Sequence, residues 1–373
     1  MERLYWNNDW KFAETWEEAM KEAVYPENEM EDVRLPHTCK ELPCHYFDEH
    51  AYQMLCGYRR HFMAPEAWQG KSVELTFEGV AHDAVVYVNG TEVKAHHCGY
   101  TAFFVEIAKY LKYGEDNVLA VRVDSRENLN IPPFGYAIDY MTFGGMYREV
   151  YVQVRNKTHL ADVFVKPQIH PLQVTTEITV QNISDGITLQ QEIRKKGEGA
   201  YSPLGKKPVK QTNVQTVFPV QEICLWEPEN PYLYEIRTSL WKNGEMIDAR
   251  VDITGFREAG FRKDGFYLNG KKLRLRGLNR HQSYPYVGYA APASMQIFDA
   301  DILKKELGVN AVRTSHYPQS QDFIRRCDEI GLLVFTEFPG WQHIGDEEWK
   351  RQAVQNLKEM IVQYRNHPSI ILW

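Results

Sequence analysis

Hydrophobic and polar positions alternate with strand-like spacing along much of residues 1–156. The runs are SVELTFEGV (72–80), DAVVYVNGTEV (83–93), NVLAVRVD (117–124) and REVYVQV (148–154), and turn residues separate them. Asn89 and Gly90 tolerate the positive φ of a tight two-residue turn, so VYVNGTEV predicts a hairpin. Strands without intervening helices over this length predict a β-sandwich or jelly-roll domain at residues 1–156.

A second set of strand patterns occupies residues 157–258. It includes VTTEITVQN (174–182) and YEIRTSLWKNGEMIDARVDI (234–253). We expect the lysine-rich polar segment near residues 195–210 to be a loop. The pattern predicts a second, smaller β-sandwich of immunoglobulin type.

After Gly260 the hydrophobic period changes, and strands alternate with helices. The predicted strands are KLRLRGLNRH (272–281), VNAVRTSHYP (309–318), LLVFTEFPGW (332–341) and SIILW (369–373), and the predicted helices are 299–308, 320–331 and 347–364. This alternation predicts parallel βα units, the first half of a (β/α)₈ TIM barrel at residues 259–373. Because SIILW has the composition of a buried strand, we expect the barrel to continue beyond Trp373, so that the chain is an N-terminal fragment.

Composition excludes several classes of partner. The chain of 373 residues has 43 basic and 50 acidic side chains, a net charge of −7, and no basic stripe for nucleic acid. Its 6 cysteines form no CxxC pair, which favours free thiols in a reducing compartment. The segment MERLYWNNDWKF has no basic n-region followed by an apolar h-region, and no window of the sequence approaches a membrane span. We therefore expect a cytoplasmic protein without nucleic-acid or membrane partners.

Candidate functional residues follow the predicted barrel strands. Asn279, Arg280 and His281 come after the first strand, Arg313 and His316 after the second, and Glu337 ends the third. A histidine near a strand end is more often structural than catalytic, so none of these residues is decisive alone. The active site of such a barrel forms at the C-terminal ends of its strands, so the fold brings all six to one rim.

These segments also resemble a known family. RGLNRHQSYPYVGYA (276–290), NAVRTSHYPQSQDFIRRCDEIGLLVF (310–335) and RNHPSIILW (365–373) resemble successive segments of glycoside hydrolase family 2, the β-galactosidase and β-glucuronidase family. GYRRHF, VYVNGTEV and FGGMYREVYV resemble its sugar-binding jelly roll, and LWEPENPYLYEI resembles its immunoglobulin-like domain.

The resemblance implies a retaining exo-β-glycosidase that acts on terminal β-linked sugars through two glutamates. One glutamate protonates the departing oxygen and the other attacks the anomeric carbon. In this family both would lie after Trp373, so we expect no catalytic residue in this chain and an inactive fragment. Glu337 would be a rim residue, since a lone carboxylate lacks the partner that both roles require.

The resemblance assigns supporting roles in the barrel. Arg313 would orient the nucleophile and keep it ionised, and His316 would hydrogen-bond the sugar. Asn279 and His281 would shape the floor beside them, and Arg280 follows in the same segment.

Two further positions are expected on the basis of the resemblance. Asp139, in GYAIDYMTFGGMYREV, would reach from a jelly-roll loop and bind sugar hydroxyls; the alternative is a solvated loop aspartate. His343, in PGWQHIGD, would be a sugar-binding histidine.

The sugar is suggested by one short motif. NRHQ resembles the galactosidase forms NRHE and NRHD more than the NKHE of glucuronidases, although Gln282 departs from all three. A β-galactoside is the first expectation, a β-glucuronide or another β-glycoside the second, and a non-catalytic carbohydrate-binding protein the alternative from a different class. We expect no required cofactor; the resemblance permits magnesium or sodium, whose ligands cannot be placed. Exposed apolar faces of a half-barrel predict a homo-oligomer.

Overall fold

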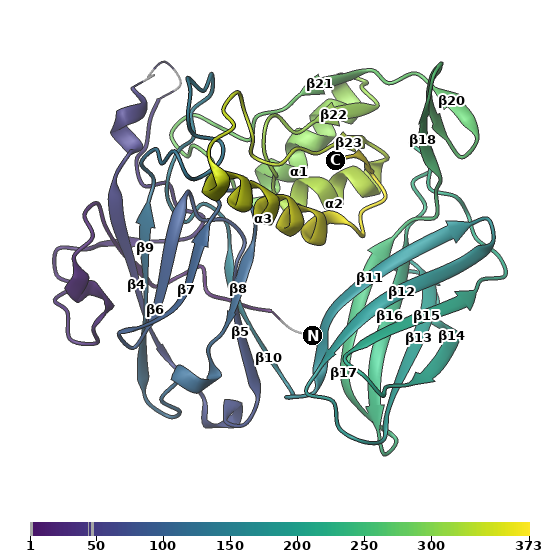
Figure 1. Ribbon diagram of the computed structural model, residues 1–373, viewed down its shortest axis with the longest axis horizontal. Coiled ribbons are helices and arrows are strands. Elements are labelled where there is room, and N and C mark those ends of the chain that lie inside the picture. The colour runs from purple at the N-terminus through teal and green to yellow at the C-terminus, as the bar shows by residue number, and fades with distance from the viewer. Residues whose placement is uncertain (1–2, 44, 46–47) are drawn as a thin grey trace.

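The computed structural model describes residues 3–43, 45 and 48–373. Two β-sandwiches flank a partial α/β barrel, with the jelly roll at the left of Figure 1 and the immunoglobulin-like domain at the lower right. No helix in the described part of the chain is long and apolar enough to cross a membrane. Five cysteines lie in that part and are free thiols (Cys39, Cys56, Cys98, Cys224 and Cys327), while Cys44 falls outside the described residues.

The jelly roll consists of two antiparallel sheets whose facing sides form one apolar core. The first sheet has the order β1 (Leu4–Tyr5), β10 (Val150–Arg155), β5 (Ser72–Phe77) and β8 (Phe103–Glu106). The second has the order β3 (Glu31–Val33), β2 (Trp10–Ala13), β4 (Leu55–Met63), β9 (Asp116–Asp124), β6 (Asp83–Val88) and β7 (Thr91–His97). Short helical turns lie in the connections: η1 (Glu18–Lys21), η2 (Glu49–Tyr52), η3 (Glu66–Trp68) and η4 (Ala108–Tyr110).

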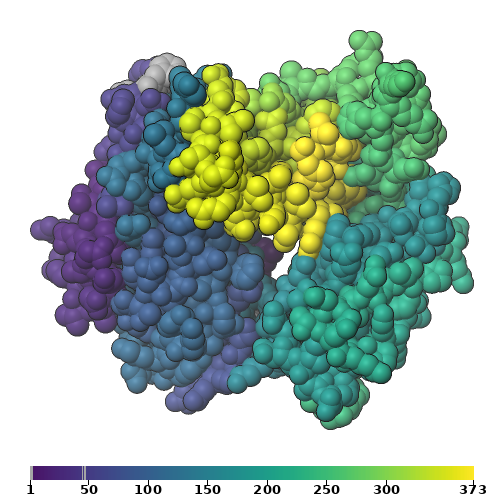
Figure 2. All heavy atoms as spheres, in the orientation of Figure 1, coloured from purple at the N-terminus to yellow at the C-terminus, as the bar shows by residue number. Residues whose placement is uncertain are grey.

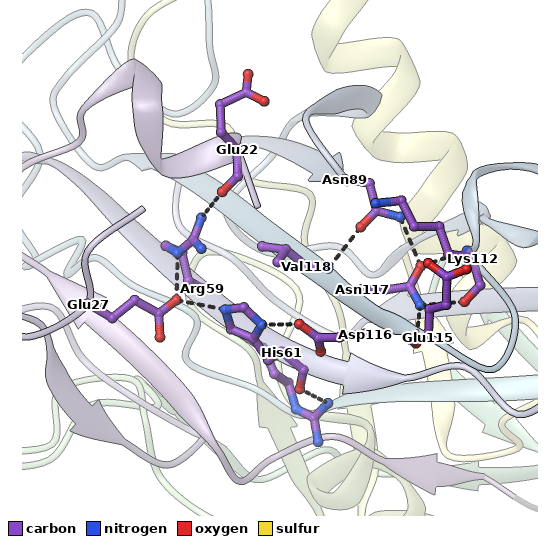
Figure 3. Close-up of polar contacts among 11 residues, drawn as sticks. Glu22, Glu27, Arg59, His61, Asn89, Lys112, Glu115, Asp116, Asn117 and Val118 are labelled. Atoms are coloured by element: carbon purple, nitrogen blue, oxygen red, sulfur yellow. Dashed lines mark hydrogen bonds and ion pairs between the residues drawn. The ribbon is translucent and has the colours of Figure 1, made fainter. Parts of the chain in front are cut away.

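The predicted hairpin is confirmed as β6 and β7. Asn89 and Gly90 form its turn with φ of 50° and 82°, values that suit these two residue types. The Asn89 side chain also ties the turn to β9, because Nδ2 donates to Asn117 Oδ1 at 2.8 Å and Oδ1 accepts from the Val118 amide at 3.0 Å (Figure 3). Asn89 therefore adopts the backbone conformation that the turn requires and also satisfies buried polar groups of β9.

The second sandwich also has two sheets. They contain β11 (His159–Ile169), β12 (Leu172–Gln181) and β15 (Asn213–Pro219) in one sheet, and β14 (Ser202–Pro208), β13 (Ile187–Lys195), β16 (Tyr234–Lys242) and β17 (Glu245–Thr254) in the other. The loop expected near residues 195–210 was wrong in part, because β14 lies within it and pairs with β13. β14 is an edge strand with exposed Lys206 and Lys207, and charged edges of this kind oppose unwanted pairing.

Residues 259–373 form the first half of a TIM barrel, as predicted. A three-stranded antiparallel sheet comes first, with β18 (Ala259–Arg262), β19 (Gly265–Leu268) and β20 (Lys271–Leu273). Four parallel strands follow in the order β21 (Gly277–Asn279), β22 (Ala311–Arg313), β23 (Leu333–Phe335) and β24 (Ile370–Leu372). The helices are α1 (Ala293–Asp301), continued by the π-helix η5 (Ile302–Glu306), α2 (Gln321–Ile330) and α3 (Glu347–Tyr364).

One detail of the barrel half differs from the sequence prediction, and another confirms it. The segment 272–281 is split, because β20 pairs antiparallel with β19 and only β21 joins the parallel sheet. α2 keeps its predicted ends: the Ser320 hydroxyl accepts from the Asp322 amide, and Gly331 closes the helix at φ 71°.

A buried arginine joins the jelly roll to the barrel half. Arg148 Nη1 donates to the carbonyls of Glu78 at 3.2 Å and Tyr100 at 3.1 Å within the jelly roll. Its Nη2 donates to Gln282 Oε1 at 3.1 Å and to the Pro318 carbonyl at 3.0 Å in the barrel half. A buried guanidinium must satisfy its donors, so this contact fixes how the two domains meet.

Two carboxyl groups lie near the same contact. Burial, together with the facing carboxyl of Glu78 and that of Asp322 at the start of α2, raises the pKa of Glu149 to about 7. Burial also raises the pKa of Glu78 itself. The domain contact therefore favours protonated glutamates here.

Helix α3 makes the second contact with the jelly roll, and Figure 2 shows its yellow atoms against the blue atoms of that domain. Glu359 Oε2 accepts from the Thr101 hydroxyl at 2.6 Å and lies 3.1 Å from His96 Nε2. Burial alone would raise the pKa of Glu359, but the hydrogen bond and charge of His96 and the Thr101 hydroxyl lower it to about 2.

The lowered pKa of Glu359 predicts a pH-dependent contribution to stability. The ionised carboxylate stabilises the folded chain above the ordinary glutamate pKa of 4.5, and this contribution is lost as the pH falls toward about 2. We expect Glu359→Gln to remove about 1–3 kcal/mol of unfolding free energy at pH 6, and much less at pH 2. Urea unfolding followed by circular dichroism measures both. Glu347→Gln, at an exposed position of the same helix, should change little, and a constant effect of Glu359→Gln at both pH values would contradict the expectation.

Candidate active site

Three polar side chains meet at the C-terminal ends of β22 and β23. Arg313, the last residue of β22, forms an ion pair through Nε with the carboxylate of Glu337. His316 Nδ1 lies 3.2 Å from Arg313 Nη2 and 3.3 Å from Glu337 Oε2. One tautomer of His316 therefore accepts from the guanidinium and the other donates to the carboxylate. Arg313, His316 and Glu337, all predicted from the sequence, lie together.

His281 joins this cluster from the segment after β21. Its ring centroid lies 5.4 Å from that of His316, and its Nδ1 lies 3.1 Å from the Tyr317 hydroxyl. Burial, followed by the neighbouring charge of His316, lowers the pKa of His281, while the charge of Asp139 opposes that change. The imidazole therefore favours its neutral form, which offers one donor and one acceptor.

A jelly-roll side chain packs over the two histidines. Tyr140 belongs to the connection between β9 and β10, and its ring centroid lies 5.4 Å from His281, 5.7 Å from His316 and 5.5 Å from Tyr317. Trp341, after β23, lies 4.2 Å from His316 and 5.9 Å from Tyr140. Sequence reasoning missed both rings. Their nearest signals were the adjacent Asp139 and the tryptophan in EFPGW.

Asp139 and Asn279 are exposed at the edge of this cluster. The charge of Asp139 acts on Tyr140, whose pKa is raised by burial first and then by Tyr317 and Asp139. Asn279 is the last residue of β21 and lies opposite Arg313 in the parallel register. Both positions agree with a place near the mouth, and their roles toward a sugar stay predictions.

Arg280 lies elsewhere. Its guanidinium donates to Asp299 Oδ2 from Nε at 2.8 Å, to Gln319 Oε1 at 2.5 Å and to Gln296 Oε1 at 2.8 Å. It also covers the Phe323 ring, with 4.1 Å between Cζ and the ring centroid. Arg280 thus points toward α1 and α2 and supports the site from behind, because neighbouring residues of an extended segment face opposite sides.

His343 contacts the jelly-roll loop instead of the charged cluster. Its ring centroid lies 5.8 Å from that of Tyr136 and 5.9 Å from that of Trp349. Gly135 passes so close that a Cβ there would lie 2.0 Å from His343 Cγ. A role of His343 in sugar binding stays a prediction. In the structure the His343 ring contacts the rings of Tyr136 and Trp349.

Three family models match the chain in succession. "Glycosyl hydrolases family 2, sugar binding domain" matches residues 14–155. "Glycosyl hydrolases family 2" matches residues 158–257, and "Glycosyl hydrolases family 2, TIM barrel domain" matches residues 260–373. The chain belongs to glycoside hydrolase family 2.

Relatives within family 2 include enzymes of two names. The chain is 47% identical to a "Beta-galactosidase" of Thermoanaerobacter pseudethanolicus, covering 99% of this chain and 51% of that protein. It is 32% identical to a "Beta-glucuronidase" of Bacteroides fragilis, covering 84% of this chain and 48% of that protein. A solved structure of Bacteroides uniformis beta-glucuronidase 2 matches with a TM-score of 0.91 and 29% identity, over 99% of this chain and 46% of that one. The chain spans about half the length of the curated relatives that it matches.

Metal ligands are not gathered in the described part of this family-2 chain. No group of three or more His, Cys, Asp or Glu side chains there could hold a metal ion. We therefore assign no ligands in these residues to the magnesium or sodium ion that the resemblance permits.

The ring of Tyr140 predicts the titration of His281. Because burial is the largest cause of the lowered pKa of His281, we expect Tyr140→Ala to raise that pKa toward its ordinary value, while Tyr140→Phe, which keeps the ring, leaves it nearly unchanged. NMR titration of the histidine ring protons measures the shift. If the alanine variant titrates like the parent chain, Tyr140 does not provide the relevant burial.

Proposed function

We propose that this chain is part of a retaining exo-β-glycosidase whose main substrates are terminal β-galactosides. The observation that carries the proposal is the convergence of Arg313, His316, Glu337 and His281 at the C-terminal strand ends of a family-2 barrel. The 47% identity to a protein named "Beta-galactosidase" supports the choice of sugar.

In the proposed mechanism, residues of this chain bind and orient, and two glutamates of the second barrel half carry out the bond changes. One glutamate gives its proton to the glycosidic oxygen as the C–O bond breaks, and the other attacks the anomeric carbon. Water then releases the sugar with retained configuration. The imidazoles of His281 and His316 supply hydrogen bonds to sugar hydroxyls, and these count most where they strengthen in the transition state.

The Arg313 guanidinium is a positive charge that its contacts with Glu337 and His316 hold in a fixed position. A guanidinium carries five N–H donors, and the contacts with Glu337 and His316 use two of them. The remaining donors would orient the nucleophilic carboxylate and favour its ionised form. Glu337 would hold Arg313 in place, in agreement with its expected role at the rim.

A β-glucuronide is the second candidate, because the solved structure with a TM-score of 0.91 is a beta-glucuronidase. A glucuronate carboxylate requires a cationic partner. In the described cluster the cation is Arg313, which is paired with Glu337 and assigned to the nucleophile, and the residues that would recognise a glucuronate carboxylate are expected in the second barrel half. Gln282 does not decide between the two, since it is buried against Arg148 at the domain contact.

Self-association and a purely carbohydrate-binding role also stay predictions. In the 373-residue chain taken alone, Leu278 and Leu372 on the outer strands of the parallel sheet are 47% and 43% exposed, and the second barrel half would cover them in the whole enzyme. A non-catalytic protein would bind galactose without cleaving any glycoside.

We expect the whole enzyme to hydrolyse p-nitrophenyl β-galactoside with retention, and the 373-residue chain alone to show no turnover. NMR of the first-formed anomer determines the stereochemistry. Formation of the α-anomer, or faster cleavage of the matching glucuronide, would contradict the proposal. Binding of galactose by the whole protein without hydrolysis would support the carbohydrate-binding alternative.

In the whole enzyme, His316→Ala should lower kcat/KM by about 2 kcal/mol or more, since a hydrogen bond to the transition state is lost. His50→Ala provides the control, because that side chain is 82% exposed in the jelly roll. Steady-state kinetics compares the two variants, and equal effects would show that His316 has no special role.

A further inference from the structure

Two rings form a rim outside the cluster of Arg313, His316, Glu337 and His281. Tyr136, in the jelly-roll loop, and His343, in the loop after β23, meet edge to face with ring centroids 5.8 Å apart. Tyr136 is 69% exposed, and Ile344 next to His343 is 74% exposed. We call Tyr136 and His343 the rim pair. Neither domain forms this surface alone.

The rim pair continues the inner rings along both segments of chain. Tyr136 precedes Tyr140 in one loop, and His343 follows Trp341 in the other, while Tyr140 and Trp341 lie against each other at 5.9 Å. The inner rings surround His316 and His281, where the terminal sugar is expected. A group attached to that sugar and pointing out of the barrel therefore meets the rim next.

We propose that Tyr136, held by His343, is the platform that binds the leaving group of the glycoside. The ligand chemistry is a flat, weakly polar ring face, either an aryl group or a second pyranose. The proposal rests on the proposed function, and it adds a specificity-determining residue from the jelly roll. An open tyrosine ring offers such a face an apolar contact and keeps a polar hydroxyl at its tip.

The platform is held in position before any ligand arrives. His343 is packed between Tyr136 and Trp349, and Gly135 lies against the imidazole with no room for a Cβ. A solvated loop tyrosine would have no such support. Binding to a preformed surface loses less conformational entropy than binding to a mobile one.

Charge around the rim limits the class of leaving group. Apart from Arg148 at the domain contact, the rim segments 134–147 and 337–349 are flanked by one cation, Lys350, which is paired with Glu347. The segments themselves contain acidic residues and no lysine: the carboxylates are Asp139, Glu337, Asp346, Glu347 and Glu348. An anionic leaving group would meet repulsion from these carboxylates. The rim therefore suits neutral aglycones.

The test uses the whole enzyme with p-nitrophenyl β-galactoside, lactose and methyl β-galactoside. The first two carry a ring in the leaving group and the third does not. We expect Tyr136→Ala to lower kcat/KM for the first two by about five- to tenfold, the size of one lost ring contact, and to change the methyl glycoside by less than about twofold. Tyr136→Phe should keep most of the activity. Tyr5→Ala, at a 54% exposed tyrosine of β1, is the control and should change none of the three.

Each outcome has a defined meaning. A selective loss with the aryl substrate, with lactose or with both supports the platform and identifies its occupant. Unchanged values with all three overturn it, and an equal loss with all three also does, because Tyr136 would then only support the fold. If the whole enzyme cleaves none of the three substrates, the proposed function fails first and the inference fails with it.

Discussion

The buried guanidinium of Arg148 is the constraint on which the arrangement of the site depends. A permanent charge away from water needs acceptors. Here Nη1 donates to two carbonyls of the jelly roll and Nη2 to Gln282 and Pro318 of the barrel half, while Nε has no partner among the described residues. The domains cannot shift against each other without leaving donors unsatisfied. The connection before β10, which carries Tyr140, is thereby held over the strand ends of the barrel.

Titratable groups at the two contacts between the jelly roll and the barrel half act in opposite directions. Glu359 favours the folded state when ionised, whereas Glu149, with a pKa raised to about 7 by burial and by Glu78, favours it when protonated. The first contribution falls as the pH drops below 4.5, and the second falls as the pH rises from 4.5 toward 7. The contact between jelly roll and barrel is therefore strongest in mildly acidic solution.

The features that the sequence predicted correctly are those that depend on residues close together in the chain. The Asn89–Gly90 turn and the end of α2 at Gly331 follow from local backbone preferences, and the alternation of strands and helices follows from hydrophobic period. Strand β14 was missed because an edge strand buries little and is polar. The direction of Arg280 and the place of Tyr140 depend on partners distant in sequence, which periodicity cannot reveal.

The connection that spans residues 125–149 leaves β9 and returns at β10, whose hydrogen bonds are made to other strands of the jelly roll. Residues 126–141 of this connection belong to no strand, so their sequence can vary while both sheets keep their registers. Gly145 and Arg148, later in the connection, are bound to the jelly roll and to both domains respectively. The proposed platform residue, Tyr136, is thus encoded apart from the barrel half, while His343, which holds it, belongs to that half. In evolutionary terms the sequence of this loop can change independently of the sequence of the barrel half. A recombination event that exchanged residues 126–141 would replace Tyr136 and leave the sequence of the barrel half, including His343, untouched.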